Sequence, residues 1–182
     1  MAEIAYAAGF NDLSHFNRAF RRMHGCAPLA FARGEGTEER QTVNAGELLE
    51  GVAHDAGRNG TDIRLNMGEP VELPLARAAI RRCLTNLTDN AARHANMIEL
   101  SMHRNGSVLE IIVDDDGPGI PEDMREDVFR PFFRLDESRN METGGTGLGL
   151  SIAQDIVHGH GGEISLSDAP AGGLRVLIRI PI

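Results

Sequence analysis

Two asparagines, Asn86 and Asn90, stand four residues apart within an apolar pattern of helical spacing. Residues four apart share a helix face, and His94 continues that face by one more turn. Asparagine is a mediocre helix former, so two on one face suggest a polar rail that binds a metal ion and phosphates. Taken alone, however, this helix is better explained as a solvated surface, with Asp89 and Arg93 forming an ordinary ion pair.

A second polar segment, Asp115–Gly119, follows directly after a strand-like pattern and reads Asp-Asp-Gly-Pro-Gly. Glycine lets backbone approach a ligand closely, and a carboxylate can accept a hydrogen bond from an amino group. A plain turn after a strand uses the same residue types. The segment is not a dinucleotide-binding fingerprint, because Gly-x-Gly-x-x-Gly is absent and no helix begins at once.

The most specific single motif is Gly144–Leu150, which has four glycines in its first six positions and leads into an amphipathic helix. Free backbone N–H groups and the positive end of a helix then coincide, which favours phosphate binding. A merely flexible loop would accept the cost of about 1 kcal/mol per interior glycine without any benefit. Upstream, Phe129–Arg134 places aromatic residues before a polar loop that also contains Arg139. Such aromatics are usually core residues, and such arginines are usually solvated.

These motifs need elements to position them, and the apolar periodicity supplies alternating helices and strands. Asn44 with Glu47 resembles a capping box, Pro74 suits a helix start, and Asn105-Gly106 indicates a hairpin. The expected helices span 44–56, 74–95, a short stretch from 121 to 129, and 147–158; the expected strands span 62–67, 98–102, 109–113, 163–168 and 174–180. The predicted fold class is an α/β (α+β) two-layer sandwich, with helices on one face of a mostly antiparallel sheet.

Residues 1–33 read as two short helices, 3–8 and 12–23, and a polar, glycine-containing stretch follows them. We therefore expect an N-terminal helical segment at 1–36, a linker at 37–43 and the main domain at 44–182. The charge is uneven: residues 1–36 carry +1, whereas residues 37–182 hold 14 arginines against 24 acidic residues, a net charge of −10. Such an acidic domain is a poor general binder of nucleic acid.

The two cysteines, Cys26 and Cys83, lie far apart without metal-type spacing, which argues against a disulfide framework or a zinc site. All 18 basic residues are arginine, so phosphate contacts must come from arginine, histidine or backbone N–H groups. No apolar run approaches the roughly 20 residues of a membrane span, and the N-terminus lacks the pattern of a signal peptide. We expect a cytoplasmic protein without a membrane segment in this chain.

Taken together, the motifs resemble the ATP-binding domain of sensor histidine kinases, within the superfamily shared with gyrase, Hsp90 and MutL. The resemblance covers residues 74–182 and keeps the family's order: an N box at 86–94, a first glycine box at 115–119, a phenylalanine box at 129–133 and a second glycine box at 145–149. It implies a sandwich that binds Mg²⁺ and ATP beneath a lid at about 134–146.

The resemblance also implies roles for individual residues. Asn90 would ligate magnesium, Asn86 would assist catalysis at the phosphates, and Asp115 would accept from the adenine amino group. His94 stands where the family packs a ring on the adenine, and Arg93 where it has a basic residue near the phosphates. The remaining implied nucleotide contacts are Gly117, Gly119, Ile120, Phe132, Thr146, Gly147, Leu148 and Gly149, together with Arg134 and Arg139, which would reach the phosphates when the lid closes.

One departure from the family concerns the phosphoacceptor. A complete kinase carries a histidine on a helical hairpin before the ATP-binding domain, and none of the seven histidines here has that sequence context. Residues 3–33 instead resemble the second helix-turn-helix of AraC-type regulators, which covers half of the usual two-motif domain. Because helix-turn-helix proteins usually need a second reading unit, we expect specific DNA binding to be weak.

Three functions are consistent with these observations. The first is the catalytic module of a sensor histidine kinase, which phosphorylates a histidine on a separate hairpin and works with a response regulator. The second is a regulator in which ATP controls DNA binding, and the third is a fusion or truncated product that only binds nucleotide. Because the acceptor histidine is missing in cis, the sequence leaves open whether the chain acts as an enzyme by itself.

Overall fold

The structure, a computed structural model, describes residues 20–21, 39–58, 60–135 and 147–182. The chain divides into two compact units, Met1–Glu39 and Arg40–Ile182. Nearly all of the first unit, with the helices expected at 3–8 and 12–23, lies outside the described residues. The fold of the second unit follows.

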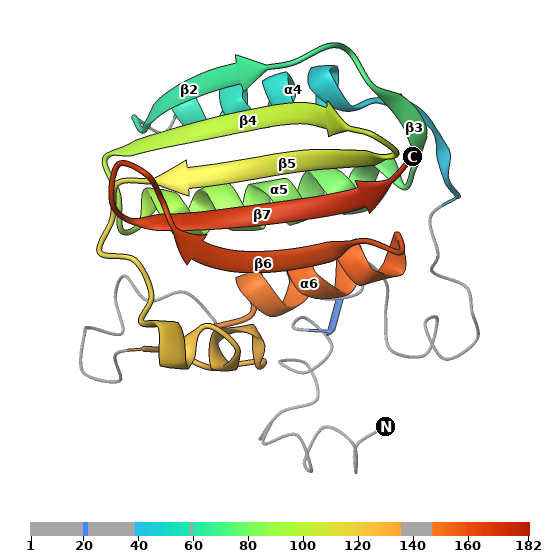
Figure 1. Cartoon of the computed structure of the whole chain (residues 1–182). Coiled ribbons are helices and arrows are strands. Elements are labelled where there is room, and N and C mark those ends of the chain that lie inside the picture. Colours follow the sequence, from blue (N-terminus) through green and yellow to red (C-terminus); the bar gives the residue numbers. More distant parts are fainter. Residues whose placement is uncertain (1–19, 22–38, 59, 136–146) are drawn as a thin grey trace, which may run out of the picture. The chain divides into compact units, whose positions relative to one another are not determined.

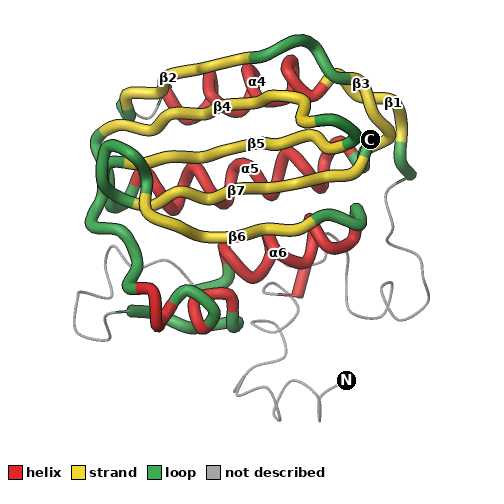
Figure 2. Tube along the Cα trace, in the orientation of Figure 1, coloured by secondary structure: helices red, strands yellow, loops and turns green. Residues whose placement is uncertain are grey.

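A five-stranded sheet forms the centre of this unit, with the strand order β2-β4-β5-β7-β6 (Figures 1 and 2). The edge strand β2 runs parallel to β4, and the other neighbours are antiparallel. The strands are β2 (Asp62–Met67), β4 (Met97–Asn105), β5 (Val108–Asp115), β6 (Glu163–Asp168) and β7 (Leu174–Pro181). All five expected strands are confirmed, and most are longer than expected.

Three helices cover one face of this sheet, as Figure 1 shows: α4 (Ala45–Gly57), α5 (Arg77–Ala92) and α6 (Gly149–Gly159). The strands bury alternate side chains beneath these helices, as in Ile98, Leu100 and Met102 of β4, all at most 1% exposed. Alternation of this kind places one face of a strand in the core and the other in water. The predicted two-layer α/β sandwich is therefore confirmed.

The helix start and the hairpin that the sequence indicated are both present. The Asn44 side chain accepts hydrogen bonds from the backbone N–H groups of Gly46 and Glu47, at 3.0 and 3.3 Å, and so caps α4. The antiparallel strands β4 and β5 pair through Asn105 and Val108, which leaves Gly106 and Ser107 as the turn. Gly106 has a φ of 62°, a left-handed conformation that suits glycine.

The expected helix start at Pro74 is wrong. Pro74 lies in strand β3 (Glu72–Leu75), which pairs with β1 (Gln41–Asn44), and α5 begins only at Arg77. The residues around Pro74 alternate between exposed and buried, a strand pattern with Leu73 and Leu75 in the core. A two-stranded sheet tolerates proline because both of its strands are edges. Neither β1 nor β3 was predicted from the sequence.

The short helix expected after Pro121 is two separate 3₁₀ turns, η1 (Glu122–Met124) and η2 (Asp127–Phe129). The helix expected at 74–95 ends earlier, at Ala92, and the one expected at 147–158 spans Gly149–Gly159.

Among the described residues, no helix is long and apolar enough to cross a membrane. Cys83 is buried in α5, and burial raises the pKa of its thiol to about 12.

A buried histidine fastens the C-terminal end of α6 to the start of α5. The Ala76 backbone N–H donates to His160 Nε2 at 3.1 Å, while His160 Nδ1 lies 2.7 Å from the Ile156 carbonyl oxygen. Nε2 thus accepts and Nδ1 donates, which assigns the neutral tautomer with its proton on Nδ1. Because Ala76 is the N-cap of α5 and no side chain caps that helix, His160 satisfies an otherwise free donor.

We expect His160→Ala to lower the free energy of unfolding by about 1–3 kcal/mol, because it leaves the buried Ala76 N–H without an acceptor. Urea denaturation followed by circular dichroism measures this. His158→Ala is the matched control, since His158 lies in the same helix turn but is exposed. Equal stabilities of the two variants would contradict the assigned role.

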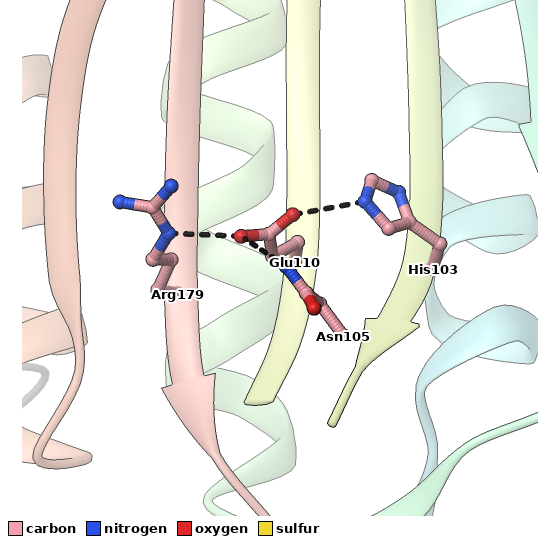
Figure 3. A network of polar contacts seen from close by, with 4 residues as sticks. All are labelled: His103, Asn105, Glu110 and Arg179. Atoms are coloured by element: carbon pink, nitrogen blue, oxygen red, sulfur yellow. Dashed lines mark hydrogen bonds and ion pairs between the residues drawn. The ribbon is translucent and has the colours of Figure 1, made fainter. Parts of the chain in front are cut away.

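The sheet face opposite the helices carries a polar network around Glu110 (Figure 3). The Glu110 carboxylate, with a side chain only 10% exposed, accepts from Arg179 Nε at 2.9 Å and lies 2.9 Å from His103 Nε2. Asn105 Nδ2 adds a longer contact of 3.5 Å. These hydrogen bonds, that from Arg179 foremost, lower the pKa of Glu110.

Because the pKa of Glu110 is lower in the folded chain than in the unfolded one, its ionised form stabilises the fold above the unfolded pKa of about 4.3. This contribution disappears as the pH falls through the folded pKa. We expect Glu110→Gln to lower the free energy of unfolding by at most about 1 kcal/mol at neutral pH, since Arg179 and His103 are half exposed. Urea denaturation at neutral pH and below the folded pKa checks this. The exposed Glu69→Gln serves as the control, and a cost that persists in acid would contradict the prediction.

Candidate functional site

The two asparagines lie half-buried on α5, beside its apolar stripe. Packing of Leu87 and Ala91 against the rest of the core fixes the helix and thereby the neighbouring Asn86 and Asn90. Asn86 faces the beginning of α6, where a Cβ on Gly149 would lie 3.7 Å from the Asn86 carbonyl oxygen. The structure therefore brings the N box and the second glycine box together.

Asn86 has an unusual hydrogen-bonding state. Its Nδ2 atom is buried and has no hydrogen-bond partner among the residues that the structure describes. A buried donor without an acceptor costs roughly 1–3 kcal/mol, so such groups call for an explanation. An oxygen-rich ligand at the start of α6 would supply the missing acceptor.

The second part of the site is Asp115, a buried carboxylate at the end of β5. Its Oδ1 accepts from the Gly117 N–H at 2.9 Å and from the Leu174 N–H at 3.2 Å. Among the described residues, no hydrogen bond to Oδ2 is present, which leaves that oxygen available for a ligand. Gly117 must be a glycine here, because a Cβ would lie 2.9 Å from Asp115 Oδ1 and 3.0 Å from the His94 carbonyl oxygen.

The neighbouring Asp116 has a structural task instead. Its Oδ1 accepts from the backbone N–H groups of Asn96 and Met97, at 2.8 and 2.9 Å, and these bonds lower the pKa of its carboxyl. This joins the end of β5 to the beginning of β4. Asp116 thus joins two strands of the sheet, whereas Asp115 holds the loop that follows β5 and the start of β7.

Gly119 and Ile120 continue the loop after Asp115. Gly119 has a φ of 72°, and Ile120 is buried. The Ile120 carbonyl oxygen accepts from Arg125 Nε at 3.0 Å, and the same guanidinium pairs with Asp168. Arg125 therefore ties this loop to the end of β6, a connection that the sequence analysis missed.

The start of α6 is shaped by close contact with the phenylalanine box. Phe132 N–H donates to the Gly147 carbonyl oxygen at 2.8 Å, and both residues have positive φ, 68° and 66°. A Cβ on Gly147 would lie 2.8 Å from the Phe132 backbone, so only glycine fits. Leu148, the N-cap of α6, is buried, and its side chain makes no capping bond, which leaves the first N–H groups of the helix without a side-chain cap.

The other predicted site residues are exposed or lie outside the described residues. Arg93 and His94 are exposed just after α5, and Arg134 and the Phe132 side chain are exposed beyond η2. Arg139 and Thr146 lie outside the described residues. β5 and α5 both end, and α6 begins, at one end of the sheet, so the described residues of the N box and of the two glycine boxes meet there (Figure 1).

This combination defines a class: a two-layer α/β domain with a polar, glycine-bearing site at one end of its sheet. The family model described as histidine kinase-, DNA gyrase B-, and HSP90-like ATPase matches residues 76–182. The chain belongs to this family, which confirms the resemblance inferred from its motifs. A helix-turn-helix domain model matches residues 1–34, in agreement with the resemblance of that segment to AraC-type regulators.

Individual relatives are sensor kinases. Sensor histidine kinase CpxA of Escherichia coli K12 is 39% identical over 139 residues, which are 75% of this chain and 30% of CpxA. Sensor-type histidine kinase PrrB of Mycobacterium leprae is 35% identical over 158 residues, 82% of this chain and 34% of PrrB. The chain thus spans about a third of the length of these relatives.

Solved structures agree with the fold. The ATP-binding domain of PrrB from Mycobacterium tuberculosis superposes with a TM-score of 0.67 at 31% identity, covering 78% of this chain and 96% of that domain. The histidine kinase domain of the E. coli osmosensor EnvZ gives a TM-score of 0.63 at 30% identity, covering 80% and 91%.

Proposed function

We propose that the chain is the Mg²⁺–ATP-binding catalytic module of a two-component sensor histidine kinase, which donates a phosphoryl group to a histidine on a separate helical hairpin. The observation that carries the proposal is the buried Asn86 Nδ2, which has no hydrogen-bond partner in the described part of the chain and lies beside the glycine-bearing start of α6. A response regulator would then receive the phosphoryl group from the hairpin. We place this activity in the cytoplasm.

Each part of the site has a task in this proposal. Asp115 Oδ2 accepts from the adenine amino group, with Gly117, Gly119 and Ile120 forming the surroundings of the base and His94 packing on it. Asn90 would hold the metal, which supplies charge neutralisation at the phosphates. Asn86 Nδ2 donates to a phosphate oxygen, and the backbone N–H groups of Gly147, Leu148 and Gly149 add further donors. Arg93, Phe132, Arg134, Arg139 and Thr146 complete the proposed contacts.

The direct test combines binding with transfer. Titration calorimetry should show ATP binding by the isolated chain that depends on Mg²⁺. Mixing the chain with purified phosphoacceptor hairpins and labelled ATP should then label a hairpin on histidine. Binding without transfer to any hairpin would favour a product that only binds nucleotide, and an absence of binding would reject the proposal.

The isolated chain should not phosphorylate its own histidines, because phosphoryl transfer needs a nucleophile held in line at about 3–3.5 Å. Both ring nitrogens of His160 are engaged, and His103 contacts Glu110 on the opposite face of the sheet. His158 lies near the C-terminal end of the 11-residue helix α6, roughly 15 Å from its start. Incubation with labelled ATP should therefore leave no acid-labile, alkali-stable label. Label that disappears when one histidine is mutated would contradict this.

A second candidate function is favoured by the helix-turn-helix match at residues 1–34. In it, ATP bound by residues 40–182 would control DNA binding by the N-terminal segment. Fluorescence anisotropy with duplex DNA, at physiological salt and with or without Mg²⁺–ATP, separates the two candidates. Nanomolar, sequence-specific binding that responds to ATP would favour the regulator; weak binding that falls uniformly with salt would favour the kinase module.

A further inference from the structure

The turn between β6 and β7, residues 169–173, reaches the carboxylate that is proposed to recognise the adenine. Leu174, the first residue of β7, donates its backbone N–H to Asp115 Oδ1 across 59 residues of sequence. With the Gly117 N–H on the same oxygen, both bonds fix the carboxylate through Oδ1. The orientation of the free Oδ2 is therefore set in part by the position of this turn.

Gly173 permits this close approach. Its φ is 86°, and a Cβ at this position would overlap the Asp115 carbonyl oxygen and lie 2.8 Å from Oδ1. Backbone contacts of this kind cannot be relieved by rotating a flexible side chain. The Gly173 carbonyl oxygen also lies near Gly119, where a Cβ would be 3.3 Å away. Gly173 thus packs against both ends of the loop that follows β5.

The preceding residue, Gly172, has a similar left-handed conformation but lacks these contacts. Its φ is 92°, and a Cβ there would meet nothing within 4 Å. Its N–H donates to the Ala169 carbonyl oxygen at 3.0 Å, a bond within the turn. Replacing either glycine by alanine therefore forces alanine into a strained left-handed conformation, but only the Cβ at position 173 would press against Asp115.

We propose that Gly173, together with the Leu174 N–H, positions Asp115 and so sets the preference of the site for a purine that carries an amino group. Gly173 is a positioning residue, because it acts through Asp115. This inference rests on the proposed function, in which Asp115 receives the adenine amino group. It adds the β6–β7 turn to the elements that determine nucleotide specificity.

The experiment compares Gly173→Ala with Gly172→Ala in the full chain. Titration calorimetry measures the affinities for Mg²⁺–ATP and for purine riboside triphosphate, which lacks the amino group. In the wild type, the hydrogen bond to a charged acceptor should favour ATP by about tenfold or more. Gly173→Ala should weaken ATP binding by about tenfold and bring the two affinities close together, whereas Gly172→Ala should keep the wild-type ratio.

Each outcome distinguishes the inference from the proposed function. If Gly173→Ala kept the wild-type ratio of the affinities for Mg²⁺–ATP and purine riboside triphosphate, the inference would be overturned. ATP binding by the wild type would still stand. A wild type that binds neither nucleotide would reject the proposed function itself. Thermal unfolding should show that both alanine variants are folded.

A second measurement, on the wild type and on Asp115→Ala, covers the case in which Gly173→Ala does not fold. Hydrogen exchange of the Leu174 amide, followed by NMR, should slow on ATP binding and quicken in Asp115→Ala. The Gly172 amide, which bonds within the turn, should change in neither case. A Leu174 amide that is indifferent to both changes would overturn the inference.

Discussion

Asp115→Asn should weaken Mg²⁺–ATP binding by about 10- to 150-fold, the equivalent of losing a hydrogen bond to a charged group worth roughly 1.5–3 kcal/mol. The Gly117 and Leu174 N–H groups both need an oxygen at the Oδ1 position. The new amide nitrogen must therefore take the Oδ2 position, where it opposes the adenine amino group donor to donor. Titration calorimetry measures the loss.

The adjacent Asp116→Asn is the matched control for this change. Asp116 holds the Asn96 and Met97 N–H groups and lies outside the proposed site, so this variant should lose some stability but keep its ATP affinity. Unchanged ATP affinity in Asp115→Asn, with the chain folded, would reject the assignment of Asp115 to the adenine.

Asn90→Ala should lower the rate of phosphoryl transfer to a supplied hairpin by roughly 10²- to 10³-fold, because the metal is expected to contribute several kcal/mol to the transition state. The alanine has no amide oxygen, the type of ligand that Mg²⁺ prefers. The dependence of ATP affinity on Mg²⁺ should weaken in parallel. Single-turnover transfer with labelled ATP and calorimetry at several Mg²⁺ concentrations test the two effects.

Asp89→Ala provides the control for Asn90, since Asp89 is the preceding residue of α5 and is exposed. It removes an oxygen-bearing side chain from the same helix without touching the proposed site. If Asn90→Ala transferred phosphate at the rate of Asp89→Ala, the metal would have to be held by other residues.

Local signals in the sequence predicted much of the fold. Asn44 caps α4 as expected, because a side chain can satisfy an N–H group two or three residues away without help from the rest of the chain. Gly106 turns the β4–β5 hairpin for a similarly local reason. The helix start predicted at Pro74 was wrong, since proline fits the first turn of a helix and also an edge strand, and only the pairing of β3 with β1 decides between them.

In the site as well, local features were predictable from the sequence, whereas contacts between residues far apart in the chain were not. The motifs around Asn86, Asp115 and Gly147 are contiguous, so their types and spacing were visible in the sequence. The support of Asp115 by Leu174 was not, because a hydrogen bond between residues 59 apart depends on the packing of β7 beside β5. The doublet Gly172-Gly173 was the available signal, because glycine permits a close approach of backbone segments.

The parallel pairing of β2 with β4 has a consequence for the order in which the chain can fold. β4 and β5 are joined by two residues, so their pairing closes a very short loop, and hairpins of this kind form in about 1–10 μs. β2 reaches β4 only after β3 and the whole of α5 have intervened, because parallel neighbours need a crossover. The entropy of closing that longer loop must be overcome before β2 gains its contacts. We therefore expect the hairpin that ends at Asp115 to form early in folding and the edge strand β2 to join the sheet late.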